Sequence, residues 1–274
     1  MGKNIITASI VTYNTDEYEL TTILNCCLNS VIDKIFIVDN SPSDVLKSFS
    51  LLSDKIEYIF GQGNIGYGSA HNIAISKSID IGAVYHIILN PDILFDSRQL
   101  ADMGCFMDNN QEVAHLMPKV IYPDGELQYL CKLLPSPMDL IGRRFIPSKV
   151  LLDRLNFHFE MRASGYNKLM LVPFLSGCFM FFRVEALKAV NGFDDNFFMY
   201  CEDIDLCRRI GMAGYKSVFN PEFTIIHAHK KESFKSKSML RAHIRSAVYY
   251  FNKWGWIFDK YRDQLNKEMK QQYE

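Results

Sequence analysis

The chain has 274 residues, 48% of them hydrophobic, which is enough apolar material for one large α/β domain or two small ones. Its 30 basic residues nearly balance 31 acidic ones, so the net charge of -1 gives no electrostatic reason to expect nucleic acid as a partner. The seven cysteines include no C-x-x-C pair, and no run approaches the roughly 18 apolar residues of a membrane span, so we expect a cytoplasmic protein with reduced, mostly buried thiols and no signal peptide.

Four apolar, β-branched runs in the first 95 residues predict strands separated by helices. A helical pattern follows the first run, and a second predicted helix, Ser69 to Ile79, lies between the third and the fourth. Such alternation indicates a mostly parallel sheet with helices on both faces. The predicted strands are Ile5 to Tyr13, Asp33 to Asn40, Ile56 to Phe60 and Val84 to Leu89.

Polar or glycine-rich residues follow each of these runs. In parallel sheets ligands bind beyond the carboxyl ends of the strands. Loops are polar in any protein, which accounts for any one of these segments, but four that converge on one edge favour a binding site. The four segments are Tyr13-Asn14, Asp39-Asn40, Gly61 to Gly68 and Asn90 to Asp92.

The glycine-rich segment GQGNIGYGSAHN is neither a dinucleotide fingerprint nor a Walker loop, because its glycines continue past G-x-G-x-x-G and no Gly-Lys-Ser/Thr follows. Its glycines allow the backbone to approach a ligand, and the helix after it would turn its N-terminus toward a diphosphate. Asp92 lies in an Asn-Pro-Asp turn, where a carboxylate can hold a divalent cation against phosphate oxygens. A plain Asx turn is the alternative, and the residues alone leave both open.

Beyond residue 95 the regular alternation ends. We predict a helix at Asp96 to Asn109, a turn at Tyr122 to Gly125, a buried strand pair or bent strand within Leu169 to Arg183, and a helix from Cys201 to Ala213. The segment from Lys132 to Lys168 contains three prolines and is predicted to be an irregular, mobile region that faces an acceptor. An ordinary surface excursion is the alternative.

The segment GFDDNFFMYCEDIDLC places aromatic residues directly before three carboxylates in a first helical turn. Complementing the helix dipole, together with ion pairs to Arg208 and Arg209, explains Asp205. It does not explain why Glu202 and Asp203 directly follow the aromatic residues. A carboxylate beside such an apolar surface is a candidate general base. The residues alone support the structural and the catalytic interpretation about equally.

Two short strands, Tyr215 to Asn220 and Thr224 to Ala228, are predicted on either side of a break at Pro221, and a helix is predicted from Met239 to Trp254. His227 ends the second strand and is a candidate metal ligand, although a lone histidine is more often a satisfied surface or core residue.

The C-terminal end gathers basic and aromatic residues. We expect it to attach weakly to an anionic membrane, because each basic residue near such a surface contributes about 1 kcal/mol. Packing of the aromatics on the core is the alternative. The residues are Lys230, Lys231, Lys235, Lys237, Arg241, Arg245, Tyr249, Tyr250, Phe251, Trp254 and Trp256.

Five motifs, taken in order, resemble those of family 2 inverting glycosyltransferases, and most closely the rhamnosyltransferase-like branch. The resemblance extends from Ile5 to about His229, and it implies a GT-A fold, a mostly parallel Rossmann-like sheet with a fused acceptor-binding half. In that fold residues 1–95 would bind the nucleotide sugar, 96–229 would bind the acceptor and catalyse within the same compact domain, and 230–274 would be a helical extension. The motifs are VTYN, VDN, GNIGYGSAHN, LNPD and GFDDNFFMYCEDIDLCRRIGMAG.

The resemblance implies transfer of a sugar, rhamnose in that branch, from a dTDP-, UDP- or GDP-linked donor to a saccharide or lipid-linked acceptor. The reaction would proceed with inversion, in the synthesis of bacterial surface polysaccharide at the inner face of the cell membrane. A non-catalytic module that binds sugar nucleotides on the same fold is the alternative, and a nucleotidyltransferase is a more distant one.

Residue by residue, the resemblance implies that Asp203 is the base with Glu202 beside it, and that Asp92 and His227 hold Mg²⁺ or Mn²⁺. Relatives often carry Asp-x-Asp where this chain has Asn90, so one carboxylate is absent from the expected metal site. The donor would be contacted by Thr12, Tyr13, Asn14, Asp39, Asn40, Asn64, Gly66, Asn72 and Asn90.

Overall fold

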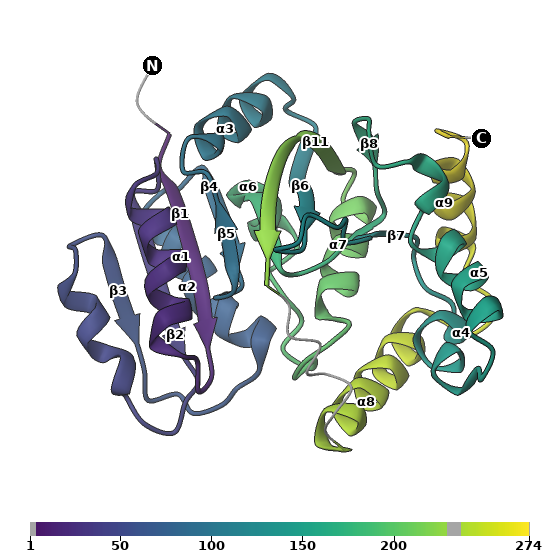
Figure 1. The fold of residues 1–274 in the computed structure, drawn as a ribbon, viewed down its shortest axis with the longest axis horizontal. Coiled ribbons are helices and arrows are strands. Elements are labelled where there is room, and N and C mark those ends of the chain that lie inside the picture. Colours follow the sequence, from purple (N-terminus) through teal and green to yellow (C-terminus); the bar gives the residue numbers. More distant parts are fainter. Residues whose placement is uncertain (1–3, 229–236, 274) are drawn as a thin grey trace.

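The computed structural model describes residues 4–228 and 237–273, in which helices cover both faces of a central sheet (Figure 1). The described strands of this sheet number nine and run in the order β3-β2-β1-β4-β10-β6-β11-β5, with β8 paired to β11. A separate ribbon joins β7, Cys131–Lys132, to β9, Phe174–Leu175. The nine strands are β1 Ile6–Thr12, β2 Lys34–Asp39, β3 Ile56–Ile59, β4 Tyr85–Leu89, β5 Ile93–Phe95, β6 Val113–Ile121, β8 Met170–Leu171, β10 Phe179–Arg183 and β11 Lys216–His227.

The first four strands are parallel, as predicted, and each predicted boundary is correct to within one residue. Phe36 and Val38 of β2 pack with Ala70 and Ala74 of a helix on one face, whereas the alternate residues of β2 join the main core on the other. Burial on both faces is the reason these strands read as continuous apolar runs. The covering helices are α1 Glu17–Leu28, α2 Tyr67–Asp80, α3 Gln99–Asn109 and α6 Val184–Ala189, with a 3₁₀ segment, η1, at Val45–Leu51.

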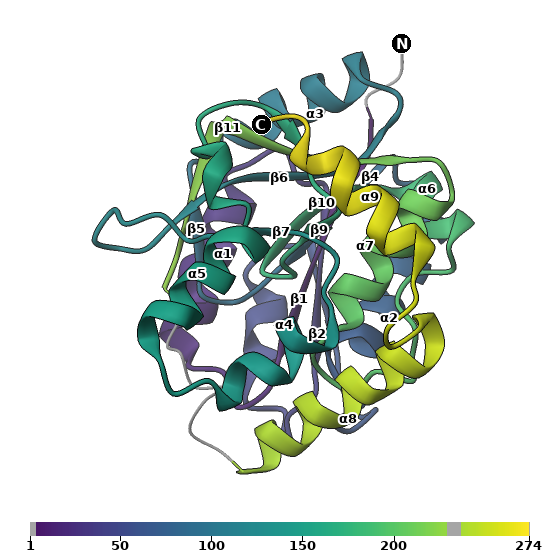
Figure 2. The same cartoon turned by 90° about the vertical axis from the view of Figure 1, so that its right-hand side faces the viewer.

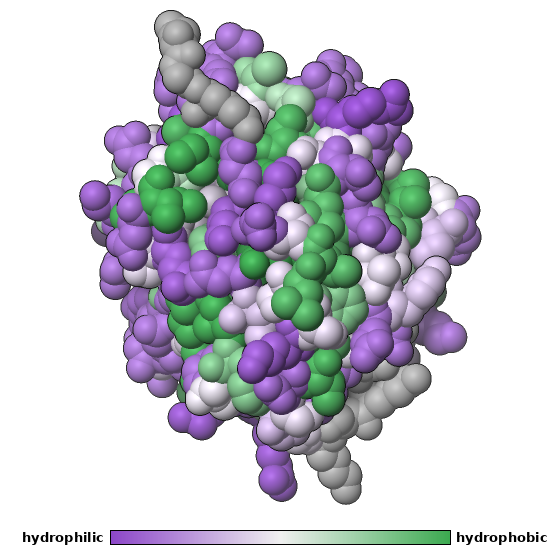
Figure 3. All heavy atoms as spheres, turned by 90° about the vertical axis from the view of Figure 1, so that its left-hand side faces the viewer, coloured by the Kyte–Doolittle hydropathy of each residue, from purple (hydrophilic) through white to green (hydrophobic). Residues whose placement is uncertain are grey.

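The second half of the sheet is mixed. β10 runs antiparallel to β4 and β6, and β11 runs parallel to β6 and antiparallel to β5. β5 precedes residue 95 in the chain yet pairs with the last strand, so the sheet continues across the expected boundary between the two halves. On the β3 side of the molecule, hydrophobic and hydrophilic side chains are interspersed (Figure 3), as is usual for a surface in contact with water.

The prediction that the segment from Lys132 to Lys168 is irregular is wrong over much of its length. It contains α4, Pro137–Leu140, and α5, Lys149–Phe159, with 3₁₀ turns η2, Gly142–Phe145, and η3, Arg162–Ser164. The prolines misled the prediction because Pro137 is the first residue of α4, where a missing N–H costs nothing, and Pro135 and Pro147 lie just before the N-caps of α4 and α5. A capping box also begins α4, since the Ser136 amide donates to Asp139 Oδ2 at 2.8 Å.

Two further predictions need correction. Pro221 does not end a strand, because β11 continues through a register shift between Asn220 and Thr224 that absorbs it as a bulge. Leu169 to Arg183 forms three short strands rather than one bent strand or a pair, in which β8 pairs with β11, β9 with β7, and β10 with both β4 and β6. The turn at Tyr122 to Gly125 is confirmed, and its Gly125 amide donates to the Tyr122 carbonyl at 2.9 Å.

Helix α7, Glu202–Met212, is where the carboxylate-rich stretch predicted it. Asp205 pairs with Arg209 at 2.7 Å, as expected, and its other oxygen binds Lys253 and the Trp254 indole. The predicted pair with Arg208 is wrong, because the Arg208 guanidinium binds Asp259 instead, at 2.7 Å from Nη2 to Oδ1. This buried pair holds the C-terminal end of the chain against α7.

Helix α8, Lys237–Trp254, and helix α9, Lys260–Lys270, follow, and they lie with α4 and α5 at one end of the molecule (Figures 1 and 2). Tyr250 and Phe251 are almost fully buried, so packing on the core is correct for these aromatics. Lys230, Lys231 and Lys235 lie outside the described residues. In the described part of the chain, none of the helices combines the length and apolar composition that crossing a bilayer requires. All seven cysteines are free and most are buried, as predicted.

Three buried histidines brace the sheet. His86 Nε2 lies 2.8 Å from Ser9 Oγ, which in turn lies 2.7 Å from His71 Nδ1. His115 stacks on Phe182 with ring centroids 4.2 Å apart. Burial lowers the pKa of His86 and His115 to about 3, and burial together with the neighbouring His86 lowers the pKa of His71 well below its ordinary value. All three rings are therefore neutral in the folded protein near pH 7.

This neutrality predicts acid lability. Below about pH 6.5 the histidines of the unfolded chain bind protons that the folded chain excludes, so each lowers the free energy of unfolding by about 1.4 kcal/mol per pH unit. We expect His115→Phe, which keeps the stacking partner but cannot titrate, to make urea unfolding less sensitive to pH between about pH 7.5 and 5. The exposed His158→Phe is the matched control and should keep the wild-type slope. Equal slopes for wild type and His115→Phe would contradict the assignment.

Candidate active site

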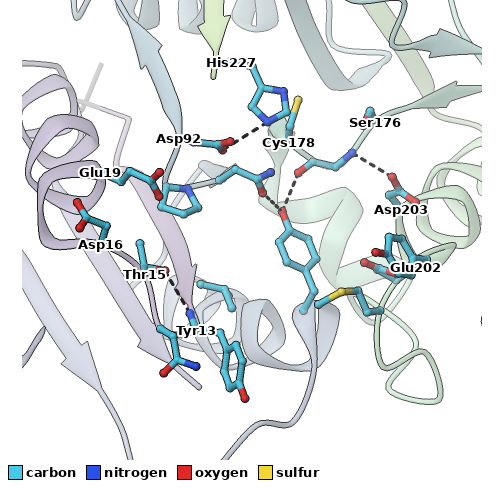
Figure 4. A pocket seen from close by; sticks show the side chains of 18 residues that line it. Tyr13, Thr15, Asp16, Glu19, Asp92, Ser176, Cys178, Glu202, Asp203 and His227 are labelled. Atoms are coloured by element: carbon cyan, nitrogen blue, oxygen red, sulfur yellow. Dashed lines mark hydrogen bonds and ion pairs between the residues drawn. The ribbon is translucent and has the colours of Figure 1, made fainter. Parts of the chain in front are cut away.

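A cavity of about 610 Å³ opens beyond the carboxyl ends of β1 and β4. Figure 4 shows Asp92 and His227 on one side of this cavity and Glu202 and Asp203 on the other. Asp92 is at least 110 positions from the other three residues, so the fold itself brings the two predicted pairs together. Seven predicted site residues line the cavity: Tyr13, Asn14, Asn90, Asp92, Glu202, Asp203 and His227.

The other predicted donor contacts do not line it. Asp39 is fully buried and accepts hydrogen bonds from the Tyr58 hydroxyl at 2.6 Å and the Ser41 amide at 3.0 Å. Asn40 is buried as well and donates to a backbone carbonyl of the glycine-rich segment. The predicted residues outside the cavity lining are Thr12, Asp39, Asn40, Asn64, Gly66 and Asn72.

Gly66 and Asn72 hold the carboxylate-bearing segment in place. Gly66 has φ of 93°, and a Cβ there would lie 2.2 Å from the Phe198 carbonyl oxygen, so no larger residue fits without movement. The amide of Tyr67, the first residue of α2, donates to this same carbonyl at 3.0 Å, where we had expected a diphosphate. Asn72 donates to the Phe193 carbonyl at 2.9 Å and accepts from its amide at 2.8 Å.

The segment then turns sharply into α7. Tyr200 and Cys201 both adopt left-handed backbone conformations, with φ of 69° and 64°, which cost about 1 kcal/mol or more each. The sharp turn that these two residues make directs the first turn of α7 toward the cavity. There Asp203 accepts hydrogen bonds from the Gly177 amide at 3.0 Å and from the Ile204 amide at 2.9 Å.

The two neighbouring carboxyls have different environments. Glu202 is 6% exposed, and its Oε2 makes no hydrogen bond within the described residues. Burial and the charge of Asp203 raise the pKa of Glu202 well above its ordinary value. Burial also raises the pKa of Asp203, but nearby Lys132 and the two amide donors oppose this. We infer that Glu202 keeps its proton while Asp203 carries the charge, which favours Asp203 as the base.

On the opposite side, His227 Nε2 lies 3.4 Å from Asp92 Oδ1. His227 Nδ1 lies 2.9 Å from Gln128 Oε1, and Gln128 donates back to the His227 carbonyl at 2.8 Å. Burial lowers the pKa of His227, but interactions with Asp92 and Cys178 outweigh this and raise the pKa to about 10. Gln128 was not predicted, because it is 99 positions from His227 and carries no motif.

The donor set of this pair fits a divalent cation shared with a ligand, provided that the cation displaces the proton that His227 holds against Asp92 in the metal-free protein. Among residues 4–228 and 237–273, no group of three or more His, Cys, Asp or Glu is arranged to hold a metal by itself. Asp92 and His227 supply one carboxylate and one imidazole, and phosphate oxygens and water would complete the coordination. Gln128 holds the other imidazole nitrogen, as is usual for a metal-binding histidine.

Tyr67 links the two sides and was not predicted as a site residue. Its hydroxyl lies 2.7 Å from the Gly177 carbonyl and 3.0 Å from Asn90 Oδ1. Burial and the nearby carboxylates raise its pKa, so the hydroxyl stays protonated and can donate. The only sequence signal was an aromatic between two glycines. A candidate base lies on one side of the cavity, and a pair of side chains that could bind one cation lies on the other. This arrangement suits displacement of an anionic leaving group by a hydroxyl.

Comparisons with known proteins identify relatives of this chain. Residues 150–246 match the model of the family described as "Glycosyltransferase like family 2". Rhamnosyltransferase WbbL of Escherichia coli (strain K12) is 30% identical over 250 residues, covering 88% of this chain and 90% of WbbL. N-acetylglucosaminyl-diphospho-decaprenol L-rhamnosyltransferase of Mycobacterium tuberculosis (strain CDC 1551 / Oshkosh) is 28% identical over 207 residues, covering 68% of this chain and 64% of the relative.

Among solved structures, the mannosyltransferase PcManGT from Pyrobaculum calidifontis, in complex with GDP-Man and Mn²⁺, superposes with a TM-score of 0.57 at 16% identity. The match covers 89% of this chain and 64% of that one. The likeness supports a GT-A fold and confirms the predicted fold class.

Proposed function

This chain belongs to glycosyltransferase family 2, and we propose that it transfers a deoxyhexose, rhamnose in the first instance, from a nucleotide diphosphate sugar to a lipid-linked saccharide with inversion. The observation that carries the proposal is a single cavity in which Asp203 faces the Asp92–His227 pair. The names of the two relatives described above support the choice of rhamnose, and the mycobacterial one supports a lipid-linked acceptor.

Each residue then has a role. Asp203 accepts the proton of the acceptor hydroxyl as its oxygen attacks the anomeric carbon, and the bond from that carbon to the diphosphate breaks with both electrons leaving on the diphosphate. Asp92 and His227 would hold a divalent cation, which when bound neutralises charge on the diphosphate. Because one ligand is an imidazole nitrogen, we propose Mn²⁺ ahead of Mg²⁺. Tyr13 is exposed at the end of β1 and lines the cavity, and we propose that its ring contacts the nucleoside.

A panel of dTDP-, UDP- and GDP-linked sugars tests the function. With Mn²⁺ present, we expect one nucleotide class to raise the melting temperature, because binding to the folded state stabilises it by mass action. The same donor should be hydrolysed slowly without acceptor. A thermal shift with no hydrolysis, and no transfer to any saccharide, would favour the non-catalytic module instead.

Peripheral membrane contact through the C-terminal end is part of the proposal, and it keeps Arg241 and Arg245 from the expected set but replaces the expected aromatics with apolar residues of α8. The outward face of α8 carries Leu240, Ile244 and Val248, each 36 to 37% exposed, with Arg241 and Arg245 beside them. The helix contains no acidic residue. Such a face suits the surface of an anionic bilayer, where a lipid-linked acceptor would be presented.

We expect sedimentation with phosphatidylglycerol vesicles at low salt and release at high salt, because surface charges are screened. Changing both Arg241 and Arg245 to Gln should weaken this binding about 30-fold, since each arginine near the surface contributes about 1 kcal/mol. The matched control changes Lys260 and Lys267 of α9 to Gln and should bind as wild type. Absence of binding at low salt would contradict membrane contact.

A further inference from the structure

A second cavity of about 510 Å³ adjoins the active site and shares Ser176 and His227 with it. Its walls come from the segment between β6 and β7, from β7 itself and from the turn after α5. The residue after Ser176 is Gly177, whose amide binds Asp203. A molecule in this cavity therefore lies next to the base, on the side away from the end of β1. Its volume is in the range of small-ligand sites.

An aromatic ring is held rigidly in this cavity with part of its surface uncovered. Tyr129 is 37% exposed, while the Arg162 guanidinium lies 4.4 Å from its ring centroid and Tyr166 meets it edge-on at 5.4 Å. Tyr166 is itself fixed, because its hydroxyl lies 2.7 Å from the Glu160 carbonyl. A rigid, partly exposed aromatic with a polar edge suits the apolar face and hydroxyls of a sugar ring.

The cavity also contains a cationic side chain, Lys132, that makes no ion pair with the residues that the structure describes. Arg162 is bound by Glu160 at 2.6 Å and by Asp153 at 2.9 Å. Lys132, in contrast, has no carboxylate within ion-pair distance among the described residues, and its ammonium lies 5.5 Å from the Phe174 ring centroid. Burial, followed by repulsion from Arg143, lowers the pKa of Lys132, although the carboxylates of Glu160 and Asp203 oppose this. A bound anion would offset both effects.

We propose that this cavity is the acceptor subsite, in which the acceptor sugar lies on Tyr129 and a phosphate of its carrier binds Lys132. The proposal rests on the proposed function and deepens it, because it makes the enzyme select saccharides that carry a phosphate next to the accepting sugar. Lys132 is then a specificity residue rather than a catalytic one. Lys132 lies close to Asp203, as this proposal requires, because the phosphate of the acceptor would bind Lys132 while its hydroxyl meets the base.

The test compares two acceptors in the full-length enzyme with its donor and Mn²⁺. One is N-acetylglucosamine linked through a diphosphate to a short saturated chain, and the other is the octyl glycoside of the same sugar. We expect Lys132→Met to lower the ratio of kcat/KM for the phosphorylated over the neutral acceptor by about 10- to 100-fold, as for a lost charge-assisted hydrogen bond. Any change in the pKa of Asp203 alters both rates alike and cancels in this ratio.

Three further variants complete the design. Lys132→Arg should recover most of the ratio, and Lys216→Met, at the opposite end of the strand that carries His227, should leave it unchanged. Tyr129→Ala should raise KM for both acceptors, whereas Tyr129→Phe should raise it little. Hydrolysis of the donor without acceptor should stay within about twofold of wild type in Lys216→Met.

The outcomes separate this proposal from the function on which it rests. An unchanged ratio in Lys132→Met would overturn the phosphate subsite, and loss of donor hydrolysis in that variant would assign Lys132 to the donor instead. If the wild-type enzyme hydrolyses no sugar nucleotide and transfers to neither acceptor, the proposed function itself fails.

Discussion

Asp203→Asn is expected to lower kcat by about 10² or more while donor binding and folding stay close to wild type. The amide keeps the size of the carboxylate and, through its single oxygen, one of the two hydrogen bonds that the Gly177 amide makes to Oδ2 and the Ile204 amide makes to Oδ1, but it cannot accept the acceptor proton. Donor binding is measured by thermal shift, and turnover by release of the nucleoside diphosphate. Near-normal turnover would remove Asp203 from the role of base.

Glu202→Gln is the matched control, because it changes the adjacent carboxyl on the same helical turn. The buried Glu202 holds its proton, so replacing the acid by a neutral amide should cost little turnover. If Glu202→Gln is the crippling change and Asp203→Asn is not, the base moves by one residue and the mechanism stands.

The pH profile distinguishes the two carboxyls further. Burial raises the pKa of Asp203, so its ionised form, and with it kcat/KM, should be lost as pH falls through a value above that of an ordinary aspartate. The residual activity of Asp203→Asn should lack this acidic limb. A limb that persists unchanged in the variant would assign it to another group.

Asp92→Ala and His227→Ala are each expected to raise the Mn²⁺ concentration needed for donor binding by about 100-fold or more, and the double variant should be little worse than either. Both side chains lie on one side of the cavity, 3.4 Å apart, and would serve one ion, so losing either ligand removes most of the site. The measurement is the thermal shift produced by the donor across a Mn²⁺ titration. Strictly additive losses, or full activity in EDTA, would count against a shared metal.

Gln128→Ala provides a graded control for the metal site. Gln128 contacts His227 but does not line the active-site cavity, so its loss frees the imidazole to rotate without removing a proposed metal ligand. We expect a loss of metal affinity of about 10- to 100-fold, at or below that of His227→Ala. Melting temperatures without metal should be compared for all four variants, because Asp92 and His227 also interact with each other.

Much of the fold was determined locally and could be predicted. The parallel strands and their covering helices follow from apolar periods and turn residues within a dozen positions, and the predicted polar strand ends Asn14, Asn90 and Asp92 line the cavity because parallel strands end at one edge. Helix α7 could be predicted because its apolar period, acidic first turn and terminal glycine are contiguous. The order of the later strands, and α4 and α5, depended on long-range pairing and on prolines that begin helices rather than break them.

The roles of individual site residues were decided by tertiary structure. Glu202 and Asp203 are indistinguishable as neighbours in the sequence, and only burial of one and the Gly177 amide on the other separate them. Asn72 carries the polar chemistry of a ligand contact, but the segment that packs on α2 uses both ends of its amide. Gln128 meets His227 across 99 positions. Patterns in a sequence report periods and turns, whereas hydrogen-bond partners and burial depend on which distant elements pack together, and these set the chemistry of each carboxyl and amide.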